Sequence, residues 1–124
     1  MKFSGICLLT ADVPKLVSFY SKVFGVEAEG DDIHSVINVG GLGIAIWHPD
    51  GLEERIKDYP KSLRQNCYTL MFSVDDVDKE YERLKKLNIE FTELPTTHPW
   101  RCRSFAFNDP DGNSIDVHMI LQNN

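Results

Sequence analysis

The sequence lacks a long hydrophobic run and an excess of positive charge. Its longest apolar run near the N-terminus, Ile6 to Leu9, is too short for a signal-peptide core or a membrane span. Lysine and arginine number 13 against 19 aspartates and glutamates, for a formal net charge of −6 at pH 7. Nothing in this balance favours nucleic acid or a membrane surface as a partner. A chain of 124 residues with 42% hydrophobic residues is typical of one globular domain.

The sequence is also poor in cysteine. Cys7, Cys67 and Cys102 are widely spaced and form no C-x-x-C pair, which indicates reduced thiols in a cytoplasmic protein. We expect two of them to fill the core. Cys102 lies between Arg101 and Arg103, a setting that would also suit a reactive thiol if a base were near.

The first half of the chain predicts a strand, a helix and further strands. Phe3 to Leu9 is an apolar strand-like run, Asp12 is a good helix N-cap, and Gly25 can end the helix in a left-handed conformation. Strands are predicted at Ser35 to Val39 and Gly43 to Trp47, joined by a glycine turn.

The second half repeats this pattern. Tyr68 to Val74 predicts a strand, Asp75 or Asp76 a helix N-cap, and Asn88 stands where Gly25 stood. Further strands are expected at Ile89 to Phe91, Arg103 to Phe107, and Ser114 to Ile120.

Superposing the halves places Gly5 on Thr69 and Ala45 on Asp116. Such repetition predicts two strand–helix–three-strand modules within one domain. The expected boundaries are module 1 at about 1–48, a linker at about 49–66 with a short helix near 52–57, and module 2 at about 67–121 of the single domain 1–124.

The acidic stretch NDPDG near the C-terminus predicts a turn, not a calcium loop. An EF-hand starting at Asp109 needs glycine and glutamate where Ser114 and Ile120 stand. Gly112 can instead take a positive φ while Asp109 or Asn113 bonds the nearby backbone.

Together these segments carry a resemblance to a known family. Ala11 to Glu27, Val74 to Phe91 and Thr96 to Asn113 resemble the vicinal oxygen chelate superfamily, which includes glyoxalase I, bleomycin-resistance proteins, fosfomycin-resistance enzymes and extradiol dioxygenases. The resemblance implies an α+β fold of two βαβββ modules, each with a concave sheet and its helix on the convex face. It also implies a homodimer, since the concave apolar sheets are poorly covered by one short chain.

The resemblance also gives the positions at which metal-using relatives carry their ligands. These positions hold Gly5, Ala45, Thr69 and Asp116, of which only Asp116 is a strong ligand. We therefore expect no metal and no other cofactor.

Strand alternation around these positions suggests a ligand-binding groove. Its candidate residues are Trp47, Thr69, Met71, Trp100, Arg103, Asp116 and His118. Trp47 is either core or a stacking platform, and Trp100 either a lid or dimer contact or a stacking surface. Arg103 either anchors a ligand anion or pairs with Asp116, the alternative we favour.

The resulting hypothesis is a metal-independent protein that binds a small hydrophobic or planar molecule, for sequestration or sensing in the manner of bleomycin-resistance proteins. The alternative is a glyoxalase-like lyase or isomerase, or another metal-dependent enzyme with atypical ligands. A purely structural dimer with a filled groove is a third reading. No nucleophile–base pair in the sequence names a reaction.

Overall fold

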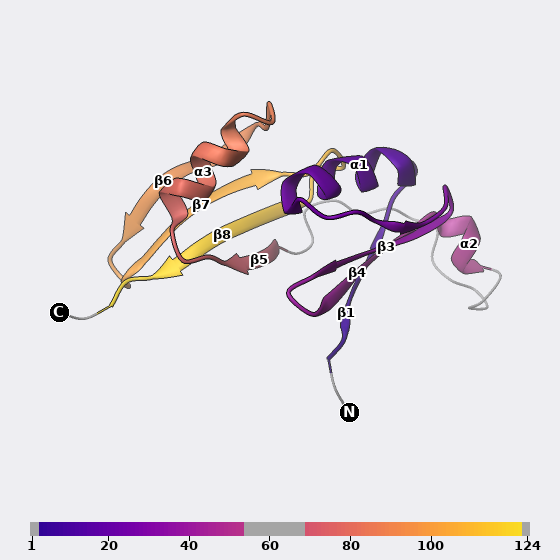
Figure 1. The fold of residues 1–124 in the computed structure, drawn as a ribbon, viewed down its shortest axis with the longest axis horizontal. Helices are drawn as coiled ribbons and strands as arrows, with labels where there is room; N and C mark the ends of the chain where they lie inside the picture. Colours follow the sequence, from indigo (N-terminus) through magenta and orange to yellow (C-terminus); the bar gives the residue numbers. More distant parts are fainter. Residues whose placement is uncertain (1–2, 54–68, 123–124) are drawn as a thin grey trace. The chain divides into compact units, whose positions relative to one another are not determined.

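The computed structural model describes residues 3–53 and 69–122, and the chain divides into two compact units, Met1–Arg64 and Gln65–Asn124 (Figure 1). Each unit contains one four-stranded sheet with a helix packed on one of its faces. No helix in the described part of the chain is long and apolar enough to cross a membrane.

The first unit has the strand order β1-β4-β3-β2, with β1 parallel to β4 and the other pairs antiparallel. Its elements are β1 (Gly5–Leu9), α1 (Val13–Phe24), β2 (Glu29–Gly30), β3 (His34–Val39), β4 (Leu42–Trp47) and α2 (Pro49–Glu53). The helix α1 packs on β3 and β4, so the side chains of Leu16, Tyr20, Ile37 and Ile46 are buried between them. The expected linker helix thus begins earlier, at Pro49, and residues 54–57 of that prediction lie outside the described residues.

The second unit repeats this arrangement with the order β5-β8-β7-β6. Its elements are β5 (Thr69–Ser73), α3 (Val77–Lys85), β6 (Phe91–His98), β7 (Cys102–Asn108) and β8 (Ser114–Ile120). Leu84 of α3 packs over a fully buried layer formed by Phe105, Phe107 and Ile115, because alternate residues of β7 and β8 face the helix.

The predicted helix caps are confirmed. The side chains of Asp12 and Asp76 each accept a hydrogen bond at 3.1 Å, from the backbone N–H of Lys15 and of Lys79. Gly25 ends α1 with φ 67°, in the left-handed region that glycine adopts without strain.

Strand register confirms the internal repeat. In β1 and β4, Gly5 lies opposite Gly43 and Cys7 opposite Ala45. In β5 and β8, Thr69 lies opposite Ser114 and Met71 opposite Asp116 in the same parallel pattern. Both units are therefore strand–helix–three-strand modules, although the two-residue β2 was not predicted from the sequence because it is too short to show alternation.

The predicted turn after β7 is also confirmed. Asp109 Oδ1 accepts hydrogen bonds from the backbone N–H groups of Asp111 and Asn113, and Oδ2 accepts one from the Asn113 side-chain amide. Gly112 has φ 85°. This buried carboxylate organises the turn that aligns β7 with β8.

Candidate functional site

The candidate site lies in the second unit, on the sheet face that points away from α3. Ile115 and Val117 of β8 are buried toward the helix, whereas Asp116 and His118 between and beyond them face the opposite side. The sequence predicted this alternation, and the structure confirms it.

Asp116 and His118 form a close pair on that face. His118 Nδ1 lies 2.7 Å from Asp116 Oδ2, and the two side chains are 19% and 24% exposed, respectively. A contact of this length between an imidazole N–H and a carboxylate is a strong, charge-assisted hydrogen bond when either partner is ionised.

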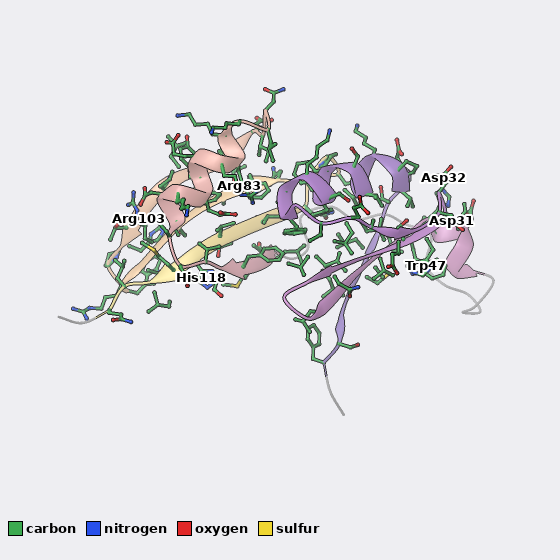
Figure 2. All side chains as sticks on the ribbon, in the orientation of Figure 1. Asp31, Asp32, Trp47, Arg83, Arg103 and His118 are labelled. Atoms are coloured by element: carbon green, nitrogen blue, oxygen red, sulfur yellow. The ribbon has the colours of Figure 1, made fainter. Side chains whose placement is uncertain are left out.

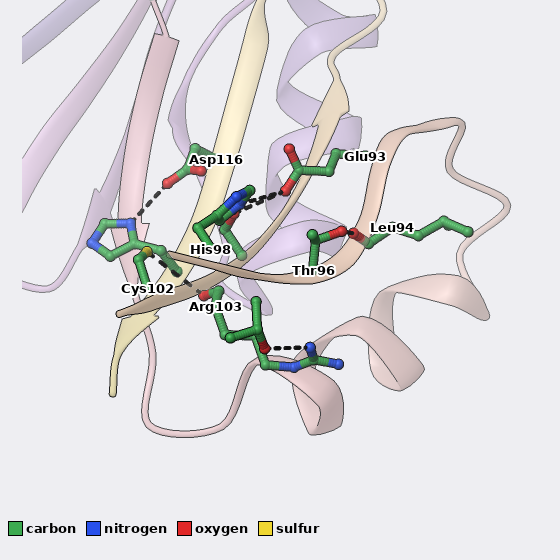
Figure 3. A network of polar contacts seen from close by, with 10 residues as sticks. Glu93, Leu94, Thr96, His98, Cys102, Arg103 and Asp116 are labelled. Atoms are coloured by element: carbon green, nitrogen blue, oxygen red, sulfur yellow. Dashed lines mark hydrogen bonds and ion pairs between the residues drawn. The ribbon is translucent and has the colours of Figure 1, made fainter. Parts of the chain in front are cut away.

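A second polar network occupies the neighbouring strands β6 and β7 (Figure 3). His98 Nε2 lies 2.9 Å from Ser104 Oγ, and Ser104 Oγ donates to Glu93 Oε1 at 2.9 Å. Ser104 is buried and lies directly opposite His118 in the β7–β8 register. The two polar groups are therefore adjacent parts of one face.

Exposed apolar side chains surround this polar centre. Met71 lies opposite Asp116 on β5 and is 68% exposed, and Ile120, two residues beyond His118, is 71% exposed. Trp100 is equally exposed and stacks on the His98 ring, with centroids 4.6 Å apart and planes 5° from parallel. Apolar surface around a few polar groups is the usual composition of a small-molecule site.

Cys102 lies near this centre, but its thiol is not activated. Burial raises the pKa of Cys102, and the negative charges of Asp116 and Glu93 raise it further. A thiol in this setting stays protonated at neutral pH, so the reactive-thiol reading has no support in the geometry. Cys7 is exposed on β1 and Cys102 is only partly buried, so the expectation that two of the three cysteines fill the core is wrong; Cys67 lies outside the described residues.

The expected pair between Arg103 and Asp116 is wrong. Arg103 Nε and Nη2 donate to the two carboxylate oxygens of Asp78 on α3, at 2.9 and 2.7 Å, and Nη1 donates to Thr97 Oγ1. The reason is strand alternation. Arg103, which is labelled in Figure 2, shares its face of β7 with Phe105, toward α3. Asp116 lies opposite Ala106 and therefore on the other face. A ligand-anchoring role for Arg103 stays a prediction, with its guanidinium already held by Asp78.

Trp47 belongs to the first unit, where it stacks on His34. The two residues are opposite each other in the β3–β4 register, and their ring centroids are 3.7 Å apart with planes at 17°. A Cβ added to Gly51 of α2 would lie 3.2 Å from the Trp47 ring, so α2 also approaches it closely. This packing favours the structural reading of Trp47, and its ligand role stays a prediction.

Comparison with known proteins places nearly the whole chain in one family. Residues 2–117 match the family described as the Glyoxalase/Bleomycin resistance protein/Dioxygenase superfamily. The chain belongs to this superfamily. The resemblance read from the sequence is thereby confirmed, together with the fold that it implied.

Individual superfamily members are similar along nearly their full length. An uncharacterised Bacillus subtilis protein, YraH, is 30% identical over 98% of this chain and 100% of its own length. The fosfomycin resistance protein FosX of Listeria innocua is 26% identical over 93% of this chain and 86% of its own. A solved glyoxalase/bleomycin resistance/dioxygenase protein from Nocardioides superposes with a TM-score of 0.83 at 22% identity, covering 100% of this chain and 86% of that one.

The positions that the resemblance predicts for metal ligands hold a donor set that does not fit a metal. In the first unit Gly5 and Ala45 supply no donor atom, and in the second Thr69 supplies a neutral hydroxyl while Asp116 is engaged by His118. Across residues 3–53 and 69–122, no group of three or more His, Cys, Asp or Glu side chains could hold an ion. Divalent transition metals need several imidazole, thiolate or carboxylate ligands.

Sequence reasoning did not find Glu93, His98 and Ser104. Their association depends on the register of the β6–β7 hairpin, which shifts twice between Phe91 and Thr96. A period-of-two pattern counted through those irregularities assigns the wrong faces. The presence of histidine and tryptophan together in the HPWRCR segment was the only available indication.

Proposed function

We propose that this protein is a metal-independent superfamily member that binds a small planar molecule on the open face of its second sheet. The observation that carries the proposal is the Asp116–His118 pair, half-buried among the exposed side chains of Met71, Ile120 and Trp100. Large exposed apolar side chains grouped around buried polar atoms usually mark a binding surface.

The side chains of this face indicate which chemical groups its ligand carries. Asp116 and Glu93 are carboxylates, so the polar centre is rich in hydrogen-bond acceptors. Trp100 offers a ring for stacking or for a cation–π contact, and Met71 a polarisable thioether. A planar ligand that carries N–H donors or a positive charge matches this set best.

Metal-independent binding is the function that we assign first, as sequestration or sensing. The relatives named for fosfomycin resistance are consistent with a chain that meets a small toxic molecule. A metal-dependent lyase or isomerase is the second candidate, supported by superfamily membership and opposed by the donor set at Gly5, Ala45 and Thr69.

We further propose a cytoplasmic homodimer. The few, dispersed cysteines suit the cytoplasm, and the exposed apolar sheet residues suit a dimer interface.

The proposal is tested with proflavine, a planar cation with amino donors, titrated into protein that has been treated with a chelator. Because proflavine absorbs where tryptophan emits, binding quenches Trp100, and a Trp47→Phe variant isolates that signal. We expect saturable quenching that is unchanged by chelator and by added nickel, zinc or iron(II). Elemental analysis that finds stoichiometric metal, with quenching only in its presence, contradicts the proposal.

A further inference from the structure

The Asp116–His118 contact fixes which ring nitrogen of His118 carries a proton. A carboxylate only accepts hydrogen bonds, so the 2.7 Å contact requires the proton on Nδ1 of His118. In the neutral ring, the lone pair is therefore on Nε2. Among the described residues, no hydrogen-bond partner occupies that nitrogen.

The position of His118 makes this lone pair available to a ligand. The side chain is 19% exposed and belongs to the same face as Met71 and Ile120. Asp116 Oδ2 holds the ring at Nδ1. This contact keeps the imidazole in one tautomer and one orientation, with Nε2 as its acceptor nitrogen, which is what a general base needs.

We propose that His118 is a metal-independent general base that removes a proton from a planar carbon acid bound on this face, with Asp116 as its positioning residue. The inference rests on the proposed function, because it assigns chemistry to the same site. It names the substrate class as a planar molecule with a C–H bond whose conjugate base is delocalised.

The step balances without an oxidant, reductant or co-reactant. The C–H bond breaks, its proton bonds to Nε2, and the electron pair stays on the substrate. That pair then either expels a leaving group within the same molecule or is protonated at another atom by the imidazolium. The outcome is an elimination or an isomerisation, and His118 returns to its neutral form by giving up the proton.

The other polar side chains of the unit do not meet these conditions. His98 uses Nε2 in its contacts with Ser104 and Glu93, and its ring face is covered by Trp100. Ser104 is buried and donates its own proton to Glu93. Of the two described histidines on this face, His118 is therefore the one whose acceptor nitrogen is not engaged by another described residue.

His48 of the first unit provides a matched control. Its Nδ1 accepts a hydrogen bond from the backbone N–H of Asp50 at 3.2 Å and lies 3.6 Å from the Asp50 carboxylate. An accepting Nδ1 places the proton of the neutral ring on Nε2, the opposite tautomer to that of His118. His48 is thus an imidazole beside an aspartate that is not arranged as a base at Nε2.

The test uses nitrobenzisoxazole, a planar carbon acid whose ring opens to a coloured cyanophenolate when a base removes its C–H proton. Nitrobenzotriazole, which cannot react, reports binding by tryptophan quenching. With chelator present, we expect wild-type protein to open the ring, and His118→Gln to lose about a hundredfold or more of kcat while its affinity for the triazole falls by much less. Added imidazole should restore turnover in His118→Ala, and Asp116→Asn should lower kcat by more than it weakens triazole binding. His48→Asn should match wild type.

The outcomes separate this inference from the proposed function. Triazole binding without ring opening, or ring opening that persists in His118→Gln, overturns the general-base inference and leaves the binding site in place. If proflavine binds but the triazole does not, the general-base inference is overturned and the binding site stays in place. If neither proflavine nor the triazole binds, both proposals are contradicted. Turnover that requires added metal also overturns the inference.

Discussion

Gly5 approaches Gly43 so closely across the β1–β4 ladder that a Cβ on Gly5 would lie 2.0 Å from the Gly43 carbonyl oxygen. Gly5 also has φ 155°, which L side chains rarely adopt. The position that the resemblance predicts for a metal ligand therefore cannot hold a side chain in this backbone. The close approach of the two strand backbones excludes a ligand side chain at Gly5. Introducing one therefore requires more than one substitution.

This contact predicts that Gly5→Ala is destabilising. Overpacking against a backbone oxygen and the strained φ together should cost about 1–3 kcal/mol of unfolding free energy. The matched control is Gly43→Ala, whose added Cβ meets nothing nearer than 3.8 Å. Chemical denaturation of both variants checks the difference, and equal midpoints would show that the close approach is not real.

Asp116→Asn should weaken proflavine binding by a factor of ten or more. A desolvated hydrogen bond to a charged group contributes roughly 1.5–3 kcal/mol, and the amide cannot replace the negative charge. Glu90→Gln removes the same charge from an exposed residue just before β6 and should leave the affinity unchanged. The fluorescence titration described above measures both, and equal losses would point to net charge instead of a specific contact.

The Asp78–Arg103 pair should make stability depend on pH in the acidic range. The hydrogen bonds from Arg103 lower the pKa of Asp78 below its ordinary value of 3.8. Because the folded-state pKa is the lower one, the stabilisation is present above 3.8 and is lost as pH falls through the folded-state pKa. The chemical-denaturation midpoints of wild type and Asp78→Asn should differ well above pH 3.8 and converge well below it. The two proteins should bind proflavine with equal affinity. The pair is exposed, so we expect a small difference.

Asp109→Ala should destabilise the second unit by about 1–3 kcal/mol, because the buried turn then has N–H donors at Asp111 and Asn113 without an acceptor. Thermal unfolding compared with Glu90→Ala, an exposed acidic residue, isolates this contribution. An unchanged midpoint would mean that solvent replaces the carboxylate at no cost.

Much of the fold was predictable because local rules and burial agree. Asp12, Gly25 and Asp76 stand where helix ends require them, and the apolar face of β8 alternates with Asp116 and His118. Such positions depend on sequence neighbours alone. The internal repeat then predicted the strand–helix–three-strand order of each module, although not the position of β2.

The site was predictable only in part because its geometry depends on non-local register. Asp116 and His118 lie two residues apart on one strand, so their shared face follows from alternation. Arg103 was assigned to Asp116 when its partner is Asp78 on α3, a contact between residues 25 positions apart. Trp47 was left open between core and stacking platform, because the sequence does not show that His34, its cross-strand neighbour, stacks on it.

The central claim is that a planar molecule binds, without metal, on the face that carries Asp116 and His118. Amide chemical-shift mapping of the chelator-treated protein during a proflavine titration tests it most directly. We expect saturable shifts concentrated in β8, at Met71 of β5, and at the Trp100 end of the β6–β7 hairpin. Shifts concentrated instead around Trp47 and α2, or no shifts until a divalent metal is added, would contradict it.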